Sequence, residues 1–142
     1  MNPILEQYSV VLSQNIIWGD MDAFDHVNNT VYFRYFEDAR IAYFDKLGVR
    51  EYKDKTNIGP ILANTDCNFK LPLKYPDNIY IAGRSTILSP KKFRMDYVVF
   101  SESLDSIAAE GQGLLVYYDY NAGESCQIPE QIVTAINSLE NR

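Results

Sequence analysis

The chain has 142 residues, 46% of them hydrophobic and 23% charged, which is the composition of one ordinary globular domain spanning residues 1–142. Its net charge is −6 and its longest basic run is Lys91-Lys92, so nucleic acid and anionic membranes are excluded as primary partners. No apolar run approaches the ~20 residues of a membrane span, and the N-terminus lacks the basic residues of a signal peptide. Cys67 and Cys126 have no motif spacing and are interpreted as reduced thiols of a cytoplasmic protein.

The first half of the chain predicts a strand and then one long helix. Residues 8–18 are predicted to form the strand, and residues 30–47 the helix, which ends at Gly48. Apolar side chains cover more than half of the circumference of this helix, which is not typical of a surface helix. We therefore expect the helix to be enclosed. The polar stretch from Val49 to Gly59 is predicted to be a loop.

Four strand patterns and a short helix are predicted in the second half. Apolar and polar residues alternate in the first strand, and turn residues separate it from the others, which predicts strands at 61–71, 79–88, 93–100 and 107–118. Short turns between strands indicate antiparallel neighbours. Pro129 is predicted at the first position of a final helix. The predicted order is β-α-β-β-β-β-α, an α+β fold in which a strongly curved sheet wraps around the long helix.

The stretch from Trp18 to Asn29 joins the first strand to this helix and contains the only histidine of the chain, His26. A carboxylate of this stretch lies just ahead of the helix N-terminus, where unpaired backbone N–H groups and the positive end of the helix dipole collect. This arrangement suits chemistry on a carbonyl group. The N–H groups polarise the oxygen while the carboxylate attacks the carbon or activates a water molecule.

The sequence WGDMDAFDHVNNTVYFRYFEDAR, together with the predicted element order, resembles the hotdog-fold acyl-CoA thioesterases of the 4-hydroxybenzoyl-CoA thioesterase type. The specific part is Asp22-x-x-x-His26-Val-Asn-Asn before an aromatic-rich helix that ends in Glu-x-Ala-Arg. A weaker match is Pro72-x-x-Tyr75-x-Asp77. The resemblance implies a curved sheet around a central helix, edge-to-edge pairing of two subunits, and active sites at the dimer interface.

The resemblance also implies roles for individual residues. Asp22 is the catalytic carboxylate, acting either as a nucleophile or as a base toward water, and the backbone N–H of Asn29 polarises the thioester oxygen. Lys91 and Lys92 match the position, at the turn between the third and fourth strands, where the family binds the phosphates of CoA; an ordinary solvated turn is the alternative. For His26 we expect a hydrogen-bonding or pocket-shaping role. Relatives often carry Gly at the position of Asp25, where this chain adds a negative charge, which either raises the pKa of Asp22 or faces solvent.

Other polar residues are interpreted as structural. Asp20 is expected to have no catalytic role, Asn28 to cap the helix, and Cys67 to lie in the core. Glu37, Asp38 and Arg40 are expected to form ion pairs at an interface or an edge. One histidine and two distant cysteines do not predict a metal site.

The resulting hypothesis is an acyl-CoA thioesterase that hydrolyses an acyl- or aryl-CoA to the free acid and CoA, without a dissociable cofactor. An acyl-carrier-protein thioester is an alternative substrate, and a non-catalytic acyl-CoA-binding domain is an alternative function. A hotdog dehydratase is disfavoured by the position of His26. A homodimer or a dimer of dimers is expected, since the two edges of a curved sheet need pairing or protection.

Overall fold

The alternating strands form one curved antiparallel sheet. In the computed structural model, which describes residues 2–142, the strands are β1 (Val10–Asn15), β2 (Ile58–Phe69), β3 (Asn78–Ser89), β4 (Lys92–Ser101), β5 (Ser106–Asp119) and β6 (Glu124–Ser125). The order across the sheet is β1-β3-β4-β5-β2, and β6 pairs with the end of β5. All pairings are antiparallel, and short turns account for this between β3 and β4 and between β4 and β5.

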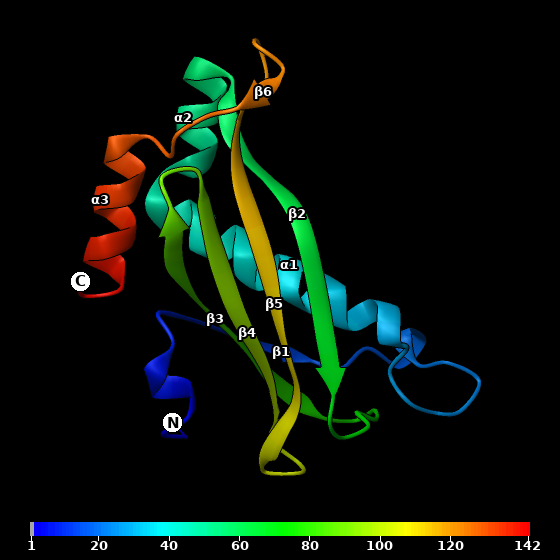
Figure 1. Ribbon diagram of the computed structural model, residues 1–142. Helices are drawn as coiled ribbons and strands as arrows, with labels where there is room; N and C mark the ends of the chain where they lie inside the picture. The colour runs from blue at the N-terminus through cyan, green and yellow to red at the C-terminus, as the bar shows by residue number, and fades with distance from the viewer. Residues whose placement is uncertain (1) are drawn as a thin grey trace.

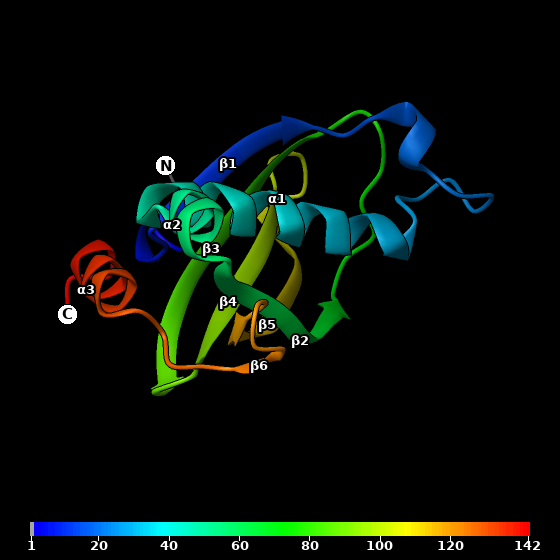
Figure 2. The ribbon, with the colours of Figure 1, turned by 90° about the horizontal axis from the view of Figure 1, so that it is seen from above.

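The long helix α1 (Asn29–Leu47) lies on the concave face of this sheet (Figure 1). The view from above in Figure 2 shows the strands curving around it from β1 on one side to β2 on the other. Most of its aromatic side chains point into the core, and its buried residues are Tyr32, Tyr35, Phe36, Ala39, Tyr43, Phe44 and Leu47. The predicted helix and its enclosure by the sheet are thus confirmed. Its predicted end at Gly48 is also confirmed, because Gly48 has a φ of 75°, in the left-handed region that ends many helices.

Close packing between α1 and the sheet depends on a glycine of β5. The ring of Phe36 stacks on Tyr97 of β4, with 4.8 Å between ring centroids and 10° between ring planes. A Cβ atom on Gly111 would lie 2.4 Å from Cε2 of Phe36 and 2.5 Å from the backbone oxygen of Asp66. Only glycine therefore fits beneath the ring while the helix keeps this distance from the sheet.

Two predictions for the first half of the chain are corrected. The first strand ends at Asn15 rather than at residue 18, because the chain leaves the sheet and forms the 3-10 turn η2 (Trp18–Asp20). The predicted loop from Val49 to Gly59 is wrong, because residues Val49–Thr56 form the helix α2. Gly48 turns the chain between the two helices, and Val49 is buried, which gives this short polar helix an anchor in the core.

The second half agrees with the predicted strands, turns and final helix. The helix α3 (Glu130–Leu139) buries Ile132 and Ile136, although Pro129 is the N-cap rather than the first helical residue. The two-residue strand β6 and the N-terminal 3-10 turn η1 (Leu5–Gln7) are additional. Among residues 2–142, no helix is both long and apolar enough to cross a membrane.

We predict that Gly111→Ala destabilises the protein, because the added methyl group overlaps the ring of Phe36 and the backbone of β2. Overpacking of this kind lowers the free energy of unfolding by about 1–3 kcal/mol. Urea denaturation measures the change. Gly19→Ala is the matched control, since a Cβ atom there meets no atom within 4 Å. Equal stability of Gly111→Ala and the unsubstituted protein would show that α1 does not press on the sheet at this point.

Candidate active site

The loop between β1 and α1 projects from one end of the molecule and holds Asp22 in a tight turn (Figure 1). The backbone N–H of Asp22 donates to the carbonyl of His26 over 2.8 Å, and the N–H of Asp25 donates to the carbonyl of Asp22 over 3.1 Å. Met21 and Val27, which flank the turn, form an antiparallel β-bridge. These contacts fix the backbone on both sides of Asp22.

One carboxylate oxygen of Asp22 is held and the other is free. Oδ1 accepts a hydrogen bond of 2.8 Å from the backbone N–H of Phe24. Within residues 2–142, Oδ2 accepts no hydrogen bond. Asp22 as a whole is half-buried. A carboxylate held in this way has a fixed direction and keeps one oxygen for a ligand or a water molecule.

The turn explains the residue at position 25. Asp25 has a φ of 62°, in the left-handed region that glycine adopts freely and that Asp and Asn tolerate better than other residues. Its side chain is exposed. Of the two alternatives for the added charge, the structure therefore favours the one in which the carboxylate faces solvent.

The start of α1 leaves one backbone donor free beside Asp22. The side chain of Asn28 caps the helix by accepting from the N–H of Thr30 over 2.9 Å, and its carbonyl accepts from the N–H of Val31 over 3.0 Å. The predicted cap at Asn28 is thereby confirmed. The N–H of Asn29 has no hydrogen-bond partner among residues 2–142. A helix N-terminus favours negative charge, so this free donor suits an oxygen that becomes negative.

A cavity of about 300 Å³ brings three of the predicted site residues together. Asp22, His26 and Asn29 line it, with Val27 and Tyr32 completing the loop and helix side. The other wall comes from the end of β2 and the segment after it, namely Phe69, Lys70, Leu71 and Pro72.

The sequence did not predict that Tyr32, or the wall formed by the end of β2 and the segment after it, belongs to this cavity. The ring of Phe69 stands edge-on to that of Tyr32, with 5.0 Å between centroids, and closes one side of the cavity. Burial raises the pKa of the Tyr32 phenol, which therefore stays protonated and neutral near pH 7. Nothing in the local sequence marks Phe69, because only the fold of β2 along α1 brings its ring to Tyr32.

Lys91 and Lys92 lie at the opposite end of the sheet from Asp22. Lys91 lies in the turn between β3 and β4 and Lys92 begins β4; the carbonyl of Lys91 accepts from the N–H of Tyr117 over 2.9 Å. The other end of β3 starts at Asn78, beside the loop that holds Asp22. Since a strand rises about 3.3 Å per residue, the 12 residues of β3 separate the two places by roughly 35–40 Å. The structure thus does not bring these lysines to the Asp22 cavity of the same chain.

Cys67 behaves as predicted. It is half-buried on β2 and packs against the core. Burial, and to a lesser extent the charge of Asp66, raises the pKa of its thiol to about 11, so the reactive thiolate is not populated near pH 7.

The predicted ion pairs of α1, from Glu37, Asp38 and Arg40, are not formed within residues 2–142. Asp38 accepts from the side-chain amide of Gln14 over 2.9 Å, and Arg40 donates to the hydroxyl of Tyr97 over 3.2 Å.

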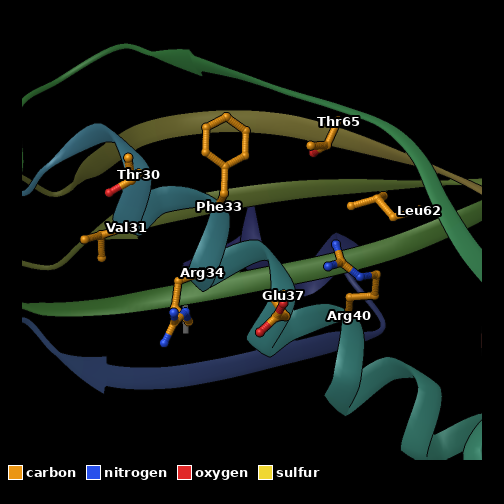
Figure 3. A pocket seen from close by; sticks show the side chains of 8 residues that line it. All are labelled: Thr30, Val31, Phe33, Arg34, Glu37, Arg40, Leu62 and Thr65. Atoms are coloured by element: carbon orange, nitrogen blue, oxygen red, sulfur yellow. The ribbon is translucent and has the colours of Figure 1, made fainter.

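Figure 3 shows that the Arg40 guanidinium points toward Leu62 of β2, across a groove of about 380 Å³ that also contains Phe33. The groove lies along the face of α1 next to the free edge of β2. Glu37 and Arg40 line it and therefore lie near an edge of the sheet, as expected, but the expected ion pairs are absent within residues 2–142.

Comparison with known proteins agrees with the fold. Residues 16–136 match the family model of the Thioesterase-like superfamily. A thioesterase from Thermus thermophilus, whose crystal structure is a complex with coenzyme A and Zn, is 28% identical with a TM-score of 0.84, covering 96% of this chain and 98% of that one. A gentisyl-coenzyme A thioesterase is 25% identical with a TM-score of 0.77, covering 89% and 99%.

A third structure shows the same fold at lower identity. A 1,4-dihydroxy-2-naphthoyl-CoA thioesterase from Synechocystis is 16% identical with a TM-score of 0.81, covering 92% of this chain and 96% of that one. The curved sheet around α1 is the hotdog fold of these proteins, as the sequence resemblance implied. The chain belongs to the Thioesterase-like superfamily and is a thioester hydrolase.

Proposed function

We propose that this protein is an acyl-CoA thioesterase that hydrolyses an acyl- or aryl-CoA to the free acid and CoA. One observation carries this proposal. The free carboxylate oxygen of Asp22 and the unpartnered N–H of Asn29 belong to residues that line the same cavity. A nucleophile or base and an oxyanion donor facing one space are the two groups that acyl transfer requires.

In the proposed reaction the thioester oxygen accepts a hydrogen bond from the N–H of Asn29. Asp22 then either attacks the carbonyl carbon, giving a mixed anhydride that water hydrolyses, or removes a proton from an attacking water molecule. In both routes the C–S bond breaks and CoA leaves as its thiolate. In both routes the helix N-terminus stabilises the negative charge on the thioester oxygen. One hydrogen-bond donor to such an oxyanion typically lowers the activation free energy by about 2.7–4 kcal/mol.

The remaining groups of the cavity shape it. The exposed His26 forms part of its rim, and its backbone carbonyl already holds Asp22, which supports a positioning role. The rings of Tyr32 and Phe69 supply an apolar wall for the acyl group. A cytoplasmic location stays a prediction from the two unpaired cysteines.

We also propose that the protein works as a homodimer or a dimer of dimers. The outer edge of β2, 12 residues long, has no strand partner within residues 2–142, and β1 forms the opposite edge. Long free edges of this kind are usually paired or protected. If Lys91 and Lys92 bind CoA phosphates, as the family resemblance implies, the Asp22 that they serve belongs to another subunit, because their own lies at the far end of β3.

We predict that Asp22→Asn lowers kcat for the best acyl-CoA by about 10²–10⁴-fold, because the amide is neither a nucleophile nor a base at neutral pH. The amide oxygen still accepts from the N–H of Phe24, so the turn and the melting temperature should be preserved. Steady-state hydrolysis of aryl-, short-, medium- and long-chain acyl-CoAs, with thermal melts, provides the measurement.

Asp20→Asn is the matched control for this experiment. Asp20 lies two residues earlier, in η2, and does not line the cavity. We expect a much milder effect on kcat. Near-normal kcat in Asp22→Asn would refute the role of Asp22, and the absence of hydrolysis with all CoA substrates in the unsubstituted protein would favour the non-catalytic binding alternative.

The proposed assembly predicts complementation between two impaired subunits. In a mixed dimer of Asp22→Asn with Lys91→Ala/Lys92→Ala, one site combines an intact Asp22 with intact lysines of the other chain. At low substrate concentration this site should restore about half of the normal rate per dimer, because a two-fold dimer has two equal sites. Mixed dimers are isolated with two different affinity tags and assayed beside each parent.

Sedimentation equilibrium at low micromolar concentration tests the assembly itself. A stable, fully active monomer would contradict the dimer proposal. If the protein is a dimer but the mixed dimer shows only the residual rate of its lysine-substituted chain, Lys91 and Lys92 do not serve the site of the other subunit.

A further inference from the structure

β1 covers only the first half of the edge of β3. The two strands pair over residues 78–83 of β3, so residues 84–89 extend beyond the start of β1. Figure 1 and Figure 2 both show α3 beside this part of the sheet, where a further strand would otherwise lie. An edge without a strand partner presents backbone N–H and C=O groups to which a strand of another chain can add.

Side chains take the place of a strand at Ser85, which lies two residues beyond the last pair, Val10 and Gly83. The backbone N–H of Ser85 donates to Oε2 of Glu140 over 3.1 Å, and its carbonyl accepts from Nη1 of Arg142 over 2.7 Å. A residue of an antiparallel strand offers these same two groups to its neighbour in a hydrogen-bonded pair. Glu140 and Arg142 therefore satisfy the groups with which an incoming strand would pair.

Two further hydroxyl groups hold the carboxylate of Glu140 in place. Its Oε2 accepts from the hydroxyls of Ser9 and Tyr43, each over 2.7 Å. The hydroxyls of Tyr43 and Ser85 also hydrogen bond to each other, and both residues are fully buried. Ser9 precedes β1, Tyr43 belongs to α1 and Ser85 to β3. One carboxylate oxygen thus connects three separate parts of the fold to the end of α3.

The donors to this carboxylate keep their protons. Burial raises the pKa of the Tyr43 phenol, which therefore stays protonated near pH 7 and donates to Glu140. Hydrogen bonds to a charged acceptor contribute more to stability than those between neutral groups. These contacts are thus strong enough to hold the residues that follow α3 against the sheet.

The backbone at the end of α3 also fixes both side chains. The N–H of Glu140 donates to the carbonyl of Ile136 over 2.9 Å, and the N–H of Arg142 donates to that of Asn137 over 2.7 Å. Ile132 and Ile136 are fully buried and anchor the helix in the core. Glu140 and Arg142 therefore reach Ser85 from a helix that is itself held in place.

This cluster is separate from the Asp22 cavity. Ser85 lies seven residues along β3 from Asn78, the end beside the loop that holds Asp22, which is a distance of roughly 23 Å. Neither Ser85 nor Glu140 lines that cavity. The proposed hydrolysis thus leaves this buried polar cluster unexplained.

We propose that Glu140 and Arg142 form a latch that keeps the second half of the β3 edge closed to a strand from a second copy of this chain. While the latch is closed, copies pair through other edges, as in the proposed dimer. Once it is lost, residues 84–89 give each copy an additional edge. Edges that differ from one another join copies head to tail, which does not close into a dimer. The inference does not depend on the proposed thioesterase activity.

Hydrogen exchange at the Ser85 amide, measured by NMR, tests the closure of the edge. In Glu140→Ala this amide should exchange about tenfold faster or more, because it loses a hydrogen bond to a charged acceptor. Arg142→Ala leaves that bond in place and should have a smaller effect. Glu130→Ala is the matched control, since it removes an exposed carboxylate at the start of the same helix. It should leave the exchange rate unchanged.

Sedimentation velocity over a range of micromolar concentrations tests the consequence for assembly. We expect Glu140→Ala/Arg142→Ala to form species larger than the assembly of the unsubstituted protein. These species should grow with concentration, dissociate on dilution and keep the far-UV circular dichroism of the folded protein. Glu130→Ala should sediment as the unsubstituted protein does.

Three results would overturn the latch. The first is equal exchange of the Ser85 amide in Glu140→Ala and Glu130→Ala. The second is faster exchange without larger species, which would show that the contacts hold α3 but do not close an edge. The third is association only with loss of the folded spectrum, which would be aggregation of unfolded chains. None of these measurements uses a thioester, so they decide the latch whether or not the protein hydrolyses acyl-CoA.

Discussion

Burial of the aromatic face of α1 is the constraint on which the other features of the molecule depend. Because the rings of this helix need cover on several sides, the sheet curves around it instead of lying flat, and Gly111 allows Phe36 to approach the sheet closely (Figure 2). The helix is thereby fixed along its length, and its first residue, Asn29, is fixed at one end of the sheet. The geometry of the site thus follows from packing that occurs far from it.

The two proposed catalytic groups use this rigidity in different ways. Asn29 would contribute a backbone N–H, which is held in place because the cap at Asn28 fixes the first turn of the helix. Asp22 contributes a side chain whose direction is set by the N–H of Phe24 and by the turn that needs a left-handed residue at Asp25. Preorganised groups of this kind stabilise developing charge without reorganising during the reaction, which is a large part of enzymatic rate enhancement.

Local patterns predicted those parts of the protein that local physics determines. The apolar α1, its end at Gly48, the alternating strands and the cap at Asn28 follow from side-chain periodicity and turn chemistry, whereas the hydrogen bonds of Asp22 needed the structure. The helix α2 was missed because it is short and polar, and its anchor, the buried Val49, is evident only after the chain turns. The pairing of Phe69 with Tyr32, and the hydrogen bond from the N–H of Val27 to the carbonyl of Leu73, arise from contacts between segments distant in sequence. The distance between Lys91 and Asp22 likewise depends on the path of β3.

In the proposed mechanism the N–H of Asn29 and the carboxylate of Asp22 act on one thioester carbonyl, and the Asn29→Pro variant isolates the part played by the N–H. Proline removes this N–H, is favoured at the first position of a helix, and suits the extended conformation of Asn28, with φ of −60° and ψ of 140°. Asn29→Ala keeps the N–H and serves as the control. We predict that kcat for the best acyl-CoA falls about 10²–10³-fold in Asn29→Pro and little in Asn29→Ala, with equal melting temperatures. A folded Asn29→Pro protein with the kcat of Asn29→Ala would show that the N–H of Asn29 does not stabilise the thioester oxygen.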